Sequence, residues 1–141
     1  MPHLSSDCSS CLAYKDPTHL EFKIVETSED MEKIRLSKYF QANAGLIYKQ
    51  VKALLLSGRK VLFSGTSCQV AALYAVLGKR KFENLITVDI VCHGVPSQKV
   101  YEKYVREVER KTSSKVASSN FRDKVSGWKR FSKKIIPHPR R

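Results

Sequence analysis

The sequence predicts an α/β fold in which helices cover a mostly parallel sheet. First, β-prone apolar runs alternate with helical patterns through short connectors. Second, the runs at residues 60–64 and 85–91 are each followed by a helical pattern, the order that makes neighbouring strands parallel. Third, a chain of 141 residues that is 42% hydrophobic can bury the core of one domain.

The N-terminal segments are predicted as an irregular lead followed by a strand and a short helix. Residues 1–14 show no hydrophobic period, and the predicted lead covers residues 1–19. Residues 20–26 alternate apolar and charged side chains, which indicates a half-buried strand. Residues 27–30 offer a hydroxyl cap and acidic groups that favour a helix start. A connecting loop is expected at residues 37–41.

Two helices flank the first predicted parallel strand. Residues 44–57 place apolar side chains on one helical face, and Gly58 is expected to end that helix. The strand at residues 60–64 is followed by a predicted tight turn at 65–68 and a helix at 69–77.

The C-terminal half continues the alternation. Residues 85–91 are dense in β-branched side chains and predict a buried strand, with a loop at 92–96. Ser97 is expected to cap a helix whose inner face carries Val100, Tyr104 and Val108. Residues 115–121 and 128–136 are strand-like, so additional C-terminal strands are expected. The predicted domain therefore spans residues 20–136, followed by a basic tail at 137–141.

The charge and hydropathy patterns restrict the location and the partners. The formal net charge is +13, and the segment from Arg122 onward carries eight Lys/Arg and one Asp. This segment is either a solvated basic end or a surface that attracts an anionic cofactor or subunit. No zinc finger, helix-turn-helix or aromatic RNA-binding motif supports a nucleic-acid partner. No run is long enough to cross a bilayer and no secretory leader opens the chain, so a cytoplasmic protein without membrane association is expected.

Four cysteines are the first candidates for chemistry: Cys8, Cys11, Cys68 and Cys92. In a reducing compartment, metal binding or catalysis is favoured over disulfides. Cys8 and Cys11 have the ligand-like CxxC spacing, but one such pair supplies only two of the four ligands that a tetrahedral metal or a cubane cluster needs.

The two strand-to-helix loops that contain Cys68 and Cys92 are the predicted functional edge. Carboxyl ends of parallel strands meet at one edge of a sheet, where ligands bind. Gly65 and Gly94 would let the backbone approach a ligand, and helix N-termini favour anions such as phosphate. Two alternatives stay open: Cys68 as a small buried apolar residue, and His93 as a structural histidine rather than a flavin contact or metal ligand.

Several segments resemble the coenzyme F420 hydrogenase/dehydrogenase β-subunit family. Residues 60–73, with Gly65-Thr-Ser-Cys-Gln69, resemble the family's GTPCQ stretch, and residues 84–97 are similar to its second signature. Residues 120–124 with 127–129 resemble a third signature. A weaker match lies at residues 33–39, so the resemblance covers roughly residues 22–135.

This resemblance implies a flavin- and iron–sulfur-containing oxidoreductase that passes electrons between clusters, FAD and, in some members, coenzyme F420. It implies a redox partner subunit or a ferredoxin. By the same resemblance, Cys68 and Cys92 are candidate ligands of a [4Fe–4S] cluster. The implied cofactor-binding residues are Gly65, Thr66, Cys68, Gln69, His93, Gly94, Asn120 and Arg122.

The sequence also departs from the family's pattern. Ser67 stands where proline is usual, and Leu36 where glycine is usual. The ferredoxin-like cysteine repeats that precede this region in longer members are not present, so the chain is expected to be truncated at both ends and its activity alone is in question. The alternative function is a non-catalytic basic α/β module that docks an acidic protein or nucleic acid.

Overall fold

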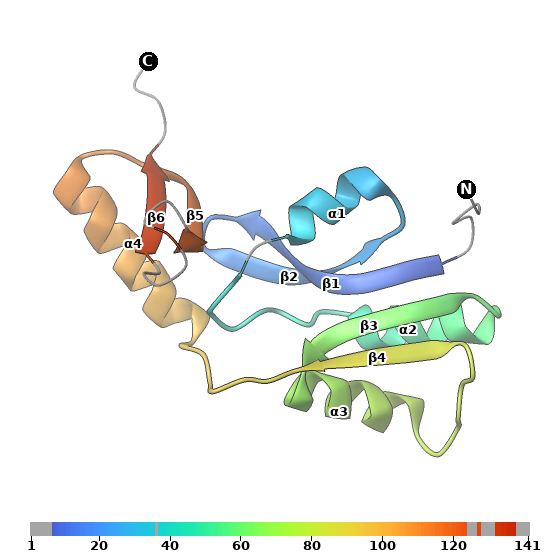
Figure 1. The fold of residues 1–141 in the computed structure, drawn as a ribbon. Helices are drawn as coiled ribbons and strands as arrows, with labels where there is room; N and C mark the ends of the chain where they lie inside the picture. The colour runs from blue at the N-terminus through green and yellow to red at the C-terminus, as the bar shows by residue number, and fades with distance from the viewer. Residues whose placement is uncertain (1–6, 36, 124–126, 128–131, 138–141) are drawn as a thin grey trace.

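The computed structural model describes residues 7–35, 37–123, 127 and 132–137. The N-terminal half contains two strands, two helices and a third strand: β1 (Asp7–Asp16), β2 (His19–Val25), α1 (Ser28–Ile34), α2 (Ile47–Leu56) and β3 (Lys60–Thr66). The C-terminal half contains α3 (Ser67–Leu77), β4 (Leu85–Ile90), α4 (Gln98–Thr112), β5 (Val116–Asp123) and β6 (Ser132–Pro137). Figure 1 shows the larger sheet beside the unit formed by α4, β5 and β6.

The main sheet has the order β2-β1-β3-β4 and confirms the predicted α/β class. Strand β3 is parallel to both β1 and β4, whereas the hairpin partner β2 is antiparallel to β1. Strands β5 and β6 form a separate antiparallel pair, which confirms the expected additional C-terminal strands. The start of the predicted strand at residues 128–136 lies outside the described residues, as do residues 138–141 of the basic tail.

Strand β1 is the main correction to the predicted elements. The irregular conformation expected for the lead is wrong over Asp7–Asp16, because this segment forms a central strand of the sheet. Its backbone pairs with β2 along one side and with β3 over Asp7–Ser10 on the other. The strand is therefore fixed by pairing with its hairpin partner β2 and with the distant β3, which its own serines and cysteines do not reveal.

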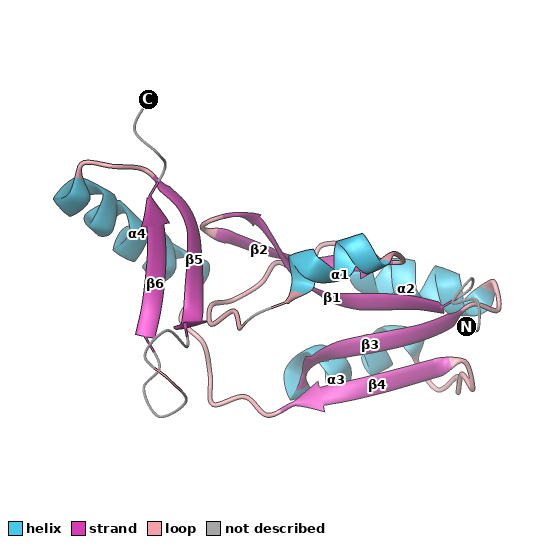
Figure 2. Ribbon diagram, turned by 45° about the horizontal axis from the view of Figure 1, so that its top comes forward, coloured by secondary structure: helices cyan, strands magenta, loops and turns pink. Residues whose placement is uncertain are grey.

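A hydrophobic cluster lies between one face of the sheet and helices α2 and α3 (Figure 2). Phe63 in the centre of β3 is fully buried, and Phe22 of β2 stacks on it with ring centroids 5.5 Å apart. Helix α2 contributes Ile47, Val51 and Leu55, which confirms the apolar face expected there. The cluster fixes α3, and with it the residues that follow β3, against the sheet.

A second cluster joins the main sheet to α4 and β5. Phe40 stacks on Tyr101 of α4 at 4.2 Å between ring centroids, and Leu20 and Val105 are buried beside them. The predicted inner face of α4 is confirmed at Val108, which packs against this cluster, and is wrong at two other positions. Val100 and Tyr104 are exposed, because the side chains one position further along the helix face the cluster.

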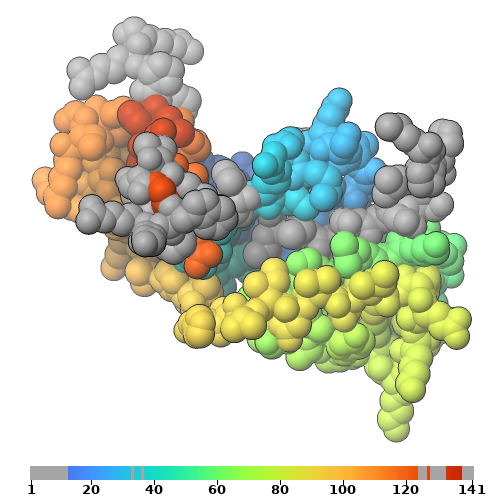
Figure 3. Space-filling model, viewed as in Figure 1, coloured from blue at the N-terminus to red at the C-terminus, as the bar shows by residue number. Residues whose placement is uncertain are grey.

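Strand β4 is formed as predicted but is not buried. It is the edge strand of the sheet, and Ile86, Val88 and Ile90 point to the face that α2 and α3 do not cover. Figure 3 shows this segment, in yellow, at the surface of the molecule. The prediction of a buried strand is wrong because a β-branched run indicates a strand without revealing whether both its faces are covered.

Within the part of the chain that the structure describes, the longest helix has 15 residues and is rich in charge, and no helix could cross a membrane.

Candidate functional site

The junction of β3 and α3 holds the first group of predicted site residues. The structure has no separate tight turn at residues 65–68: β3 runs to Thr66 and α3 begins directly at Ser67. The backbone N–H of Thr66 donates to Oε1 of Gln69 at 2.9 Å, so Gln69 closes the helix start. The space beside Gly65 is filled by the chain itself, since a Cβ there would lie 3.0 Å from Oε1 of Gln69.

Cys68 lies in the first turn of α3 and is exposed, which rules out the alternative of a small buried apolar residue. Its Sγ is 3.2 Å from Oγ1 of Thr66. Burial raises the pKa of Tyr48 in α2, and the nearby Cys68 adds a smaller electrostatic contribution in the same direction. An exposed thiol at a helix start is accessible to a metal, an oxidant or a ligand.

The second predicted loop follows β4 and is exposed along its length. The thiol of Cys92 accepts a hydrogen bond from the backbone N–H of Gly94 at 3.3 Å, and Gly94 has a positive φ of 99°. His93 is exposed and makes no hydrogen bond to the described residues, so a satisfied structural histidine does not describe it. At the end of the loop the carbonyl of Pro96 accepts from the N–H of Gln41 at 3.0 Å.

The two loops start from neighbouring strand ends, as the predicted parallel order requires. Thr66 pairs with Ile90 at the carboxyl ends of β3 and β4. The hydroxyl of Ser67 donates to Oδ1 of Asp89 at 2.9 Å and ties the start of α3 to the end of β4. The structure thus places the Cys68 and Cys92 segments at the same sheet edge.

Asn120 and Arg122 belong to the other sheet. Oδ1 of Asn120 accepts from the backbone N–H of Arg122 at 3.2 Å, and the Arg122 guanidinium lies 5.6 Å from the ring centroid of Tyr39. Both residues are on β5, which packs against α4. They do not lie at the sheet edge where β3 and β4 end. Their role toward a cofactor stays a prediction.

The donor set tests whether a metal cluster fits. Among the described residues, no three His, Cys, Asp or Glu side chains are grouped closely enough to hold a metal ion. A cubane cluster needs four ligands. The described residues therefore do not form a complete cluster site by themselves.

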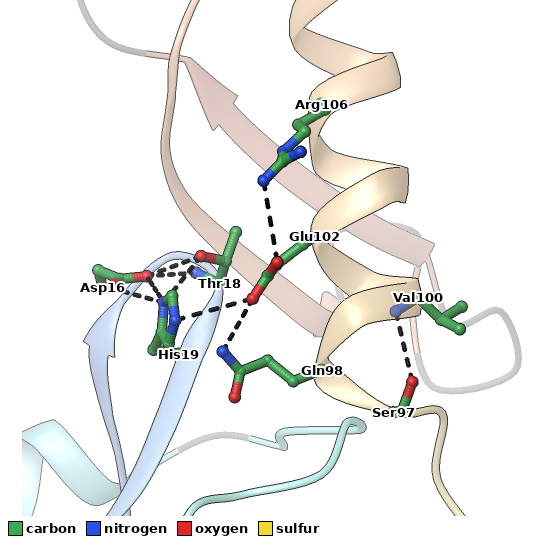
Figure 4. A network of polar contacts seen from close by, with 8 residues as sticks. All are labelled: Asp16, Thr18, His19, Ser97, Gln98, Val100, Glu102 and Arg106. Carbon is green, nitrogen blue, oxygen red and sulfur yellow. Dashed lines mark hydrogen bonds and ion pairs between the residues drawn. The ribbon is translucent and has the colours of Figure 1, made fainter.

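A polar network that the sequence did not predict connects the β1–β2 turn with α4 (Figure 4). Nδ1 of His19 lies 2.8 Å from Asp16, and Nε2 lies 3.7 Å from Glu102 of α4. Glu102 also accepts from Gln98 at 2.9 Å. Burial alone would raise the pKa of Asp16, but hydrogen bonds from His19 and Thr18 outweigh burial and lower it.

His19 and Glu102 border a cleft of about 360 Å³ that extends along α4 to Glu109 and Lys115. Its carboxylates already have partners: Glu109 accepts from the backbone N–H of Val116 at 2.9 Å and pairs with Lys115 at 3.4 Å. The network therefore fastens the hairpin to the helix, and its charges are largely compensated. No sequence signal could have found it, because its members are about 80 positions apart.

Comparison with known proteins gives one match. Residues 58–136, more than half of the chain, match the family described as the C terminus of the beta subunit of coenzyme F420 hydrogenase/dehydrogenase. No curated protein and no solved structure is similar enough to count as a match. The matched segment runs from β3 through α3, β4, α4 and β5 to β6, of which only Pro137 lies outside it, and it includes every residue predicted for the site. The chain accordingly belongs to the family formed by the C-terminal region of coenzyme F420 hydrogenase/dehydrogenase beta subunits.

Proposed function

We propose that this chain is part of an oxidoreductase subunit that passes electrons between iron–sulfur centres, FAD and coenzyme F420 or another acceptor. Its partners would be a redox subunit or a ferredoxin. Family membership supports the oxidoreductase class. The observation that best supports the location of the redox site is that β3 and β4 end at the same edge of the sheet. Cys68 and Cys92 lie in the segments that follow these two strands.

The chemistry of this edge suits a redox cofactor in two respects. Both thiols are exposed, and thiolates are the ligands that iron–sulfur clusters use. The N-terminus of α3 favours an anionic group such as a flavin phosphate, whereas the Ser67 hydroxyl there already donates to the Asp89 carboxylate. FAD would supply hydride and electron chemistry when bound. The chain's own residues would bind and orient it, with Gly65, Thr66, Gln69, His93 and Gly94 as the predicted contacts.

Two cysteines do not complete a cluster, so the proposal includes further ligands from outside this edge. We infer that Cys68 and Cys92 contribute to a [4Fe–4S] cluster whose remaining ligands lie on other residues or on the partner. Asn120 and Arg122, on β5 of the second sheet, are the remaining predicted cofactor contacts.

The test is the absorption spectrum of the protein after anaerobic reconstitution with iron, sulfide, FAD and excess 2-mercaptoethanol, whose thiolate can occupy the cluster positions that the remaining ligands would otherwise fill. We expect a retained flavin band and a broad iron–sulfur shoulder. The shoulder should disappear in Cys68→Ala and Cys92→Ala. The matched control is Cys11→Ala, which removes a cysteine of β1 and should leave both signals unchanged.

A colourless protein would contradict cofactor binding by this chain. A shoulder that persists in both loop variants and disappears in Cys11→Ala would show that the cluster is bound elsewhere than at the proposed edge. Retained flavin without any iron–sulfur signal would support the flavin part alone and reject Cys68 and Cys92 as ligands.

A further inference from the structure

Strand β4 ends the main sheet with a free backbone edge. Of the described strands it pairs only with β3, and Figure 2 shows it as the outermost strand of the sheet. The other end of the sheet is different, because Asn43 exchanges backbone hydrogen bonds with Leu20 and Phe22 of β2. The main sheet therefore has its open edge at β4.

The backbone groups of alternate β4 residues point outward from this edge. The N–H of Val61 in β3 donates to the carbonyl of Asn84 at 2.9 Å, and the pairing of β3 with β4 continues from there without a register shift. In a parallel ladder this alternation directs the N–H and C=O groups of Val88 and its even-numbered neighbours to β3. The N–H and C=O groups of Thr87 and Asp89 point away from the sheet, where another strand can bind them.

The side chains of β4 form an apolar face that lacks the usual protection of an edge strand. Ile86, Val88 and Ile90 are exposed on the face that α2 and α3 leave uncovered. Proteins commonly block such an edge with lysine, proline or a β-bulge, and β4 contains none of these. Its single charge, Asp89, lies on the other face and accepts a hydrogen bond from Ser67 at 2.9 Å. Both the backbone and the side chains of β4 therefore leave it open to pairing.

We propose that β4 pairs antiparallel with β4 of a second copy of this chain, about a two-fold axis at Val88, and joins the two four-stranded sheets into one. In this register Thr87 of one copy lies opposite Asp89 of the other, and their outward backbone groups form hydrogen-bonded pairs. The second copy also adjoins the candidate redox edge, because its β4 begins beside the end of the first β4, where the loop with Cys92 starts. The pairing itself does not depend on the proposed redox function.

The side chains favour this register over the neighbouring ones. With the axis at Val88, Ile86 of each copy lies opposite Ile90 of the other, so the three exposed aliphatic side chains are all matched on one face. With the axis one residue later, the Asp89 carboxylates of the two copies would lie opposite each other, which is unfavourable. With the axis one residue earlier, Ile90 would lie opposite the polar Asn84. Of these three registers, only the first pairs every exposed aliphatic side chain with another.

The size and the charge of this interface predict a reversible dimer. A strand of six residues is about 20 Å long, and a contact of that length is small beside the roughly 1,200 Å² of total surface that a stable interface buries. Two chains with a net charge of +13 each also repel one another, and salt screens this repulsion. In sedimentation equilibrium, the average mass of the unaltered chain should rise with protein concentration and be higher at about 0.3 M than at about 0.05 M NaCl.

Disulfide trapping tests the register. All four native cysteines are first replaced by serine, and circular dichroism checks that the fold is kept. At Val88 the two copies form a non-hydrogen-bonded pair whose Cα atoms lie about 4.5 Å apart, within the range of a disulfide. Oxidised glutathione should therefore convert the Val88→Cys chain into a covalent dimer of about 32 kDa, twice the mass of the 16.1 kDa chain. Val100→Cys, at an exposed valine of α4, is the matched control and should stay monomeric.

The positions on either side of Val88 give a second test. Ile86→Cys alone should not form a dimer, because the two copies of this residue are offset by four positions, or about 13 Å, and the same holds for Ile90→Cys. A mixture of these two variants should form the mixed dimer.

Two outcomes would overturn the proposal. Dimers formed by Ile86→Cys alone as readily as by Val88→Cys would reject the register. An unaltered chain that stays monomeric at high concentration and salt, with Val88→Cys oxidised to dimer no faster than Val100→Cys, would reject a second copy as the occupant and leave the edge to a strand of another protein.

Discussion

The packing around Gly65 leaves no room for a side chain at this position. A Cβ at this position would lie 3.0 Å from Oε1 and 3.2 Å from Cβ of Gln69, and 3.2 Å from the ring of Phe63. Gly65→Ala should therefore displace Gln69 from the Thr66 N–H and lower the free energy of unfolding by about 1–3 kcal/mol. Urea denaturation would measure this loss.

The matched control for Gly65 is Ser64→Ala, one position earlier on the opposite face of β3. We expect this change to alter the free energy of unfolding by no more than about 0.5 kcal/mol. Equal stability of the two variants would show that the β3–α3 junction adjusts without cost.

Tyr14 and Tyr101 are two buried tyrosines with different hydroxyl environments. The Tyr101 hydroxyl donates to Ser119, whereas the Tyr14 hydroxyl is buried without a hydrogen-bond partner in the described part of the chain. Tyr101→Phe should cost about 1–2 kcal/mol of unfolding free energy, and Tyr14→Phe should be neutral or stabilising by up to about 1 kcal/mol. Thermal unfolding of both variants at neutral pH tests this contrast.

The same pair gives a pH dependence. Burial raises the pKa of Tyr14 to about 12, above the ordinary value of 10.0, and outweighs the opposing effect of the nearby Ser119 hydroxyl. Between about pH 10 and 12 the unfolded chain releases this proton while the folded chain keeps it, so stability falls as the pH rises through this range. The slope should be smaller in Tyr14→Phe, and an unchanged alkaline slope would contradict the burial of this hydroxyl.

At the scale of elements, the exposed edge strand β4 predicts self-association. Ile86, Val88 and Ile90 are 65%, 45% and 49% exposed, and an apolar edge strand can pair with another chain. Val88→Lys should reduce the apparent mass measured by light scattering at high protein concentration and leave the unfolding free energy almost unchanged. Val100→Lys, the same change at an exposed valine of α4, should not reduce the mass.

The elements that the sequence predicted well are those with local signals. The helices α2 and α3 end at glycine-marked positions, and the strand at β3 is a compact apolar run. Strand β1 was missed because its conformation depends on pairing with β2 and β3. The exposure of β4 was missed because composition does not specify which side of a sheet is covered.

In the candidate site, too, features with a local sequence signal were predictable and contacts between distant residues were not. Parallel strand order is enough to predict that the Cys68 and Cys92 segments share an edge, and the Ser67–Asp89 hydrogen bond is found there. The His19–Glu102 network and the contact between Lys133 and the Tyr104 ring join residues that are distant in sequence. Such contacts depend on how α4 packs against its neighbours. The spacing of apolar residues along a segment predicts a helix but not which distant segment that helix will contact.

For the whole molecule, the net charge of +13 allows a test of the alternative function as a nucleic-acid or acidic-protein module. We expect weak binding to a DNA duplex of about 20 base pairs, lost by about 0.2 M salt, because phosphate contacts alone release counterions and are screened. Fluorescence anisotropy with two unrelated duplex sequences measures this. Binding that persists at about 0.2 M salt and prefers one sequence would favour the alternative.

The two hydrophobic clusters are linked through one face of β2. Leu20 belongs to the cluster with α4, and Phe22, two residues later, belongs to the cluster with α2 and α3. The outer edge of β2 is also occupied, since the N–H of Asn43 donates to the Leu20 carbonyl at 2.8 Å. The hairpin therefore contributes to both clusters at once.

The parallel pairing of β1 with β3 has a consequence for the newly made chain. Cys8 pairs with Val61, so the central strand leaves the ribosome more than fifty residues before its partner. At roughly 5–20 residues per second, this gap lasts on the order of 3–10 s. During that interval Phe22 has neither β3 nor α3 to cover it, and the early hairpin is a natural client for a chaperone.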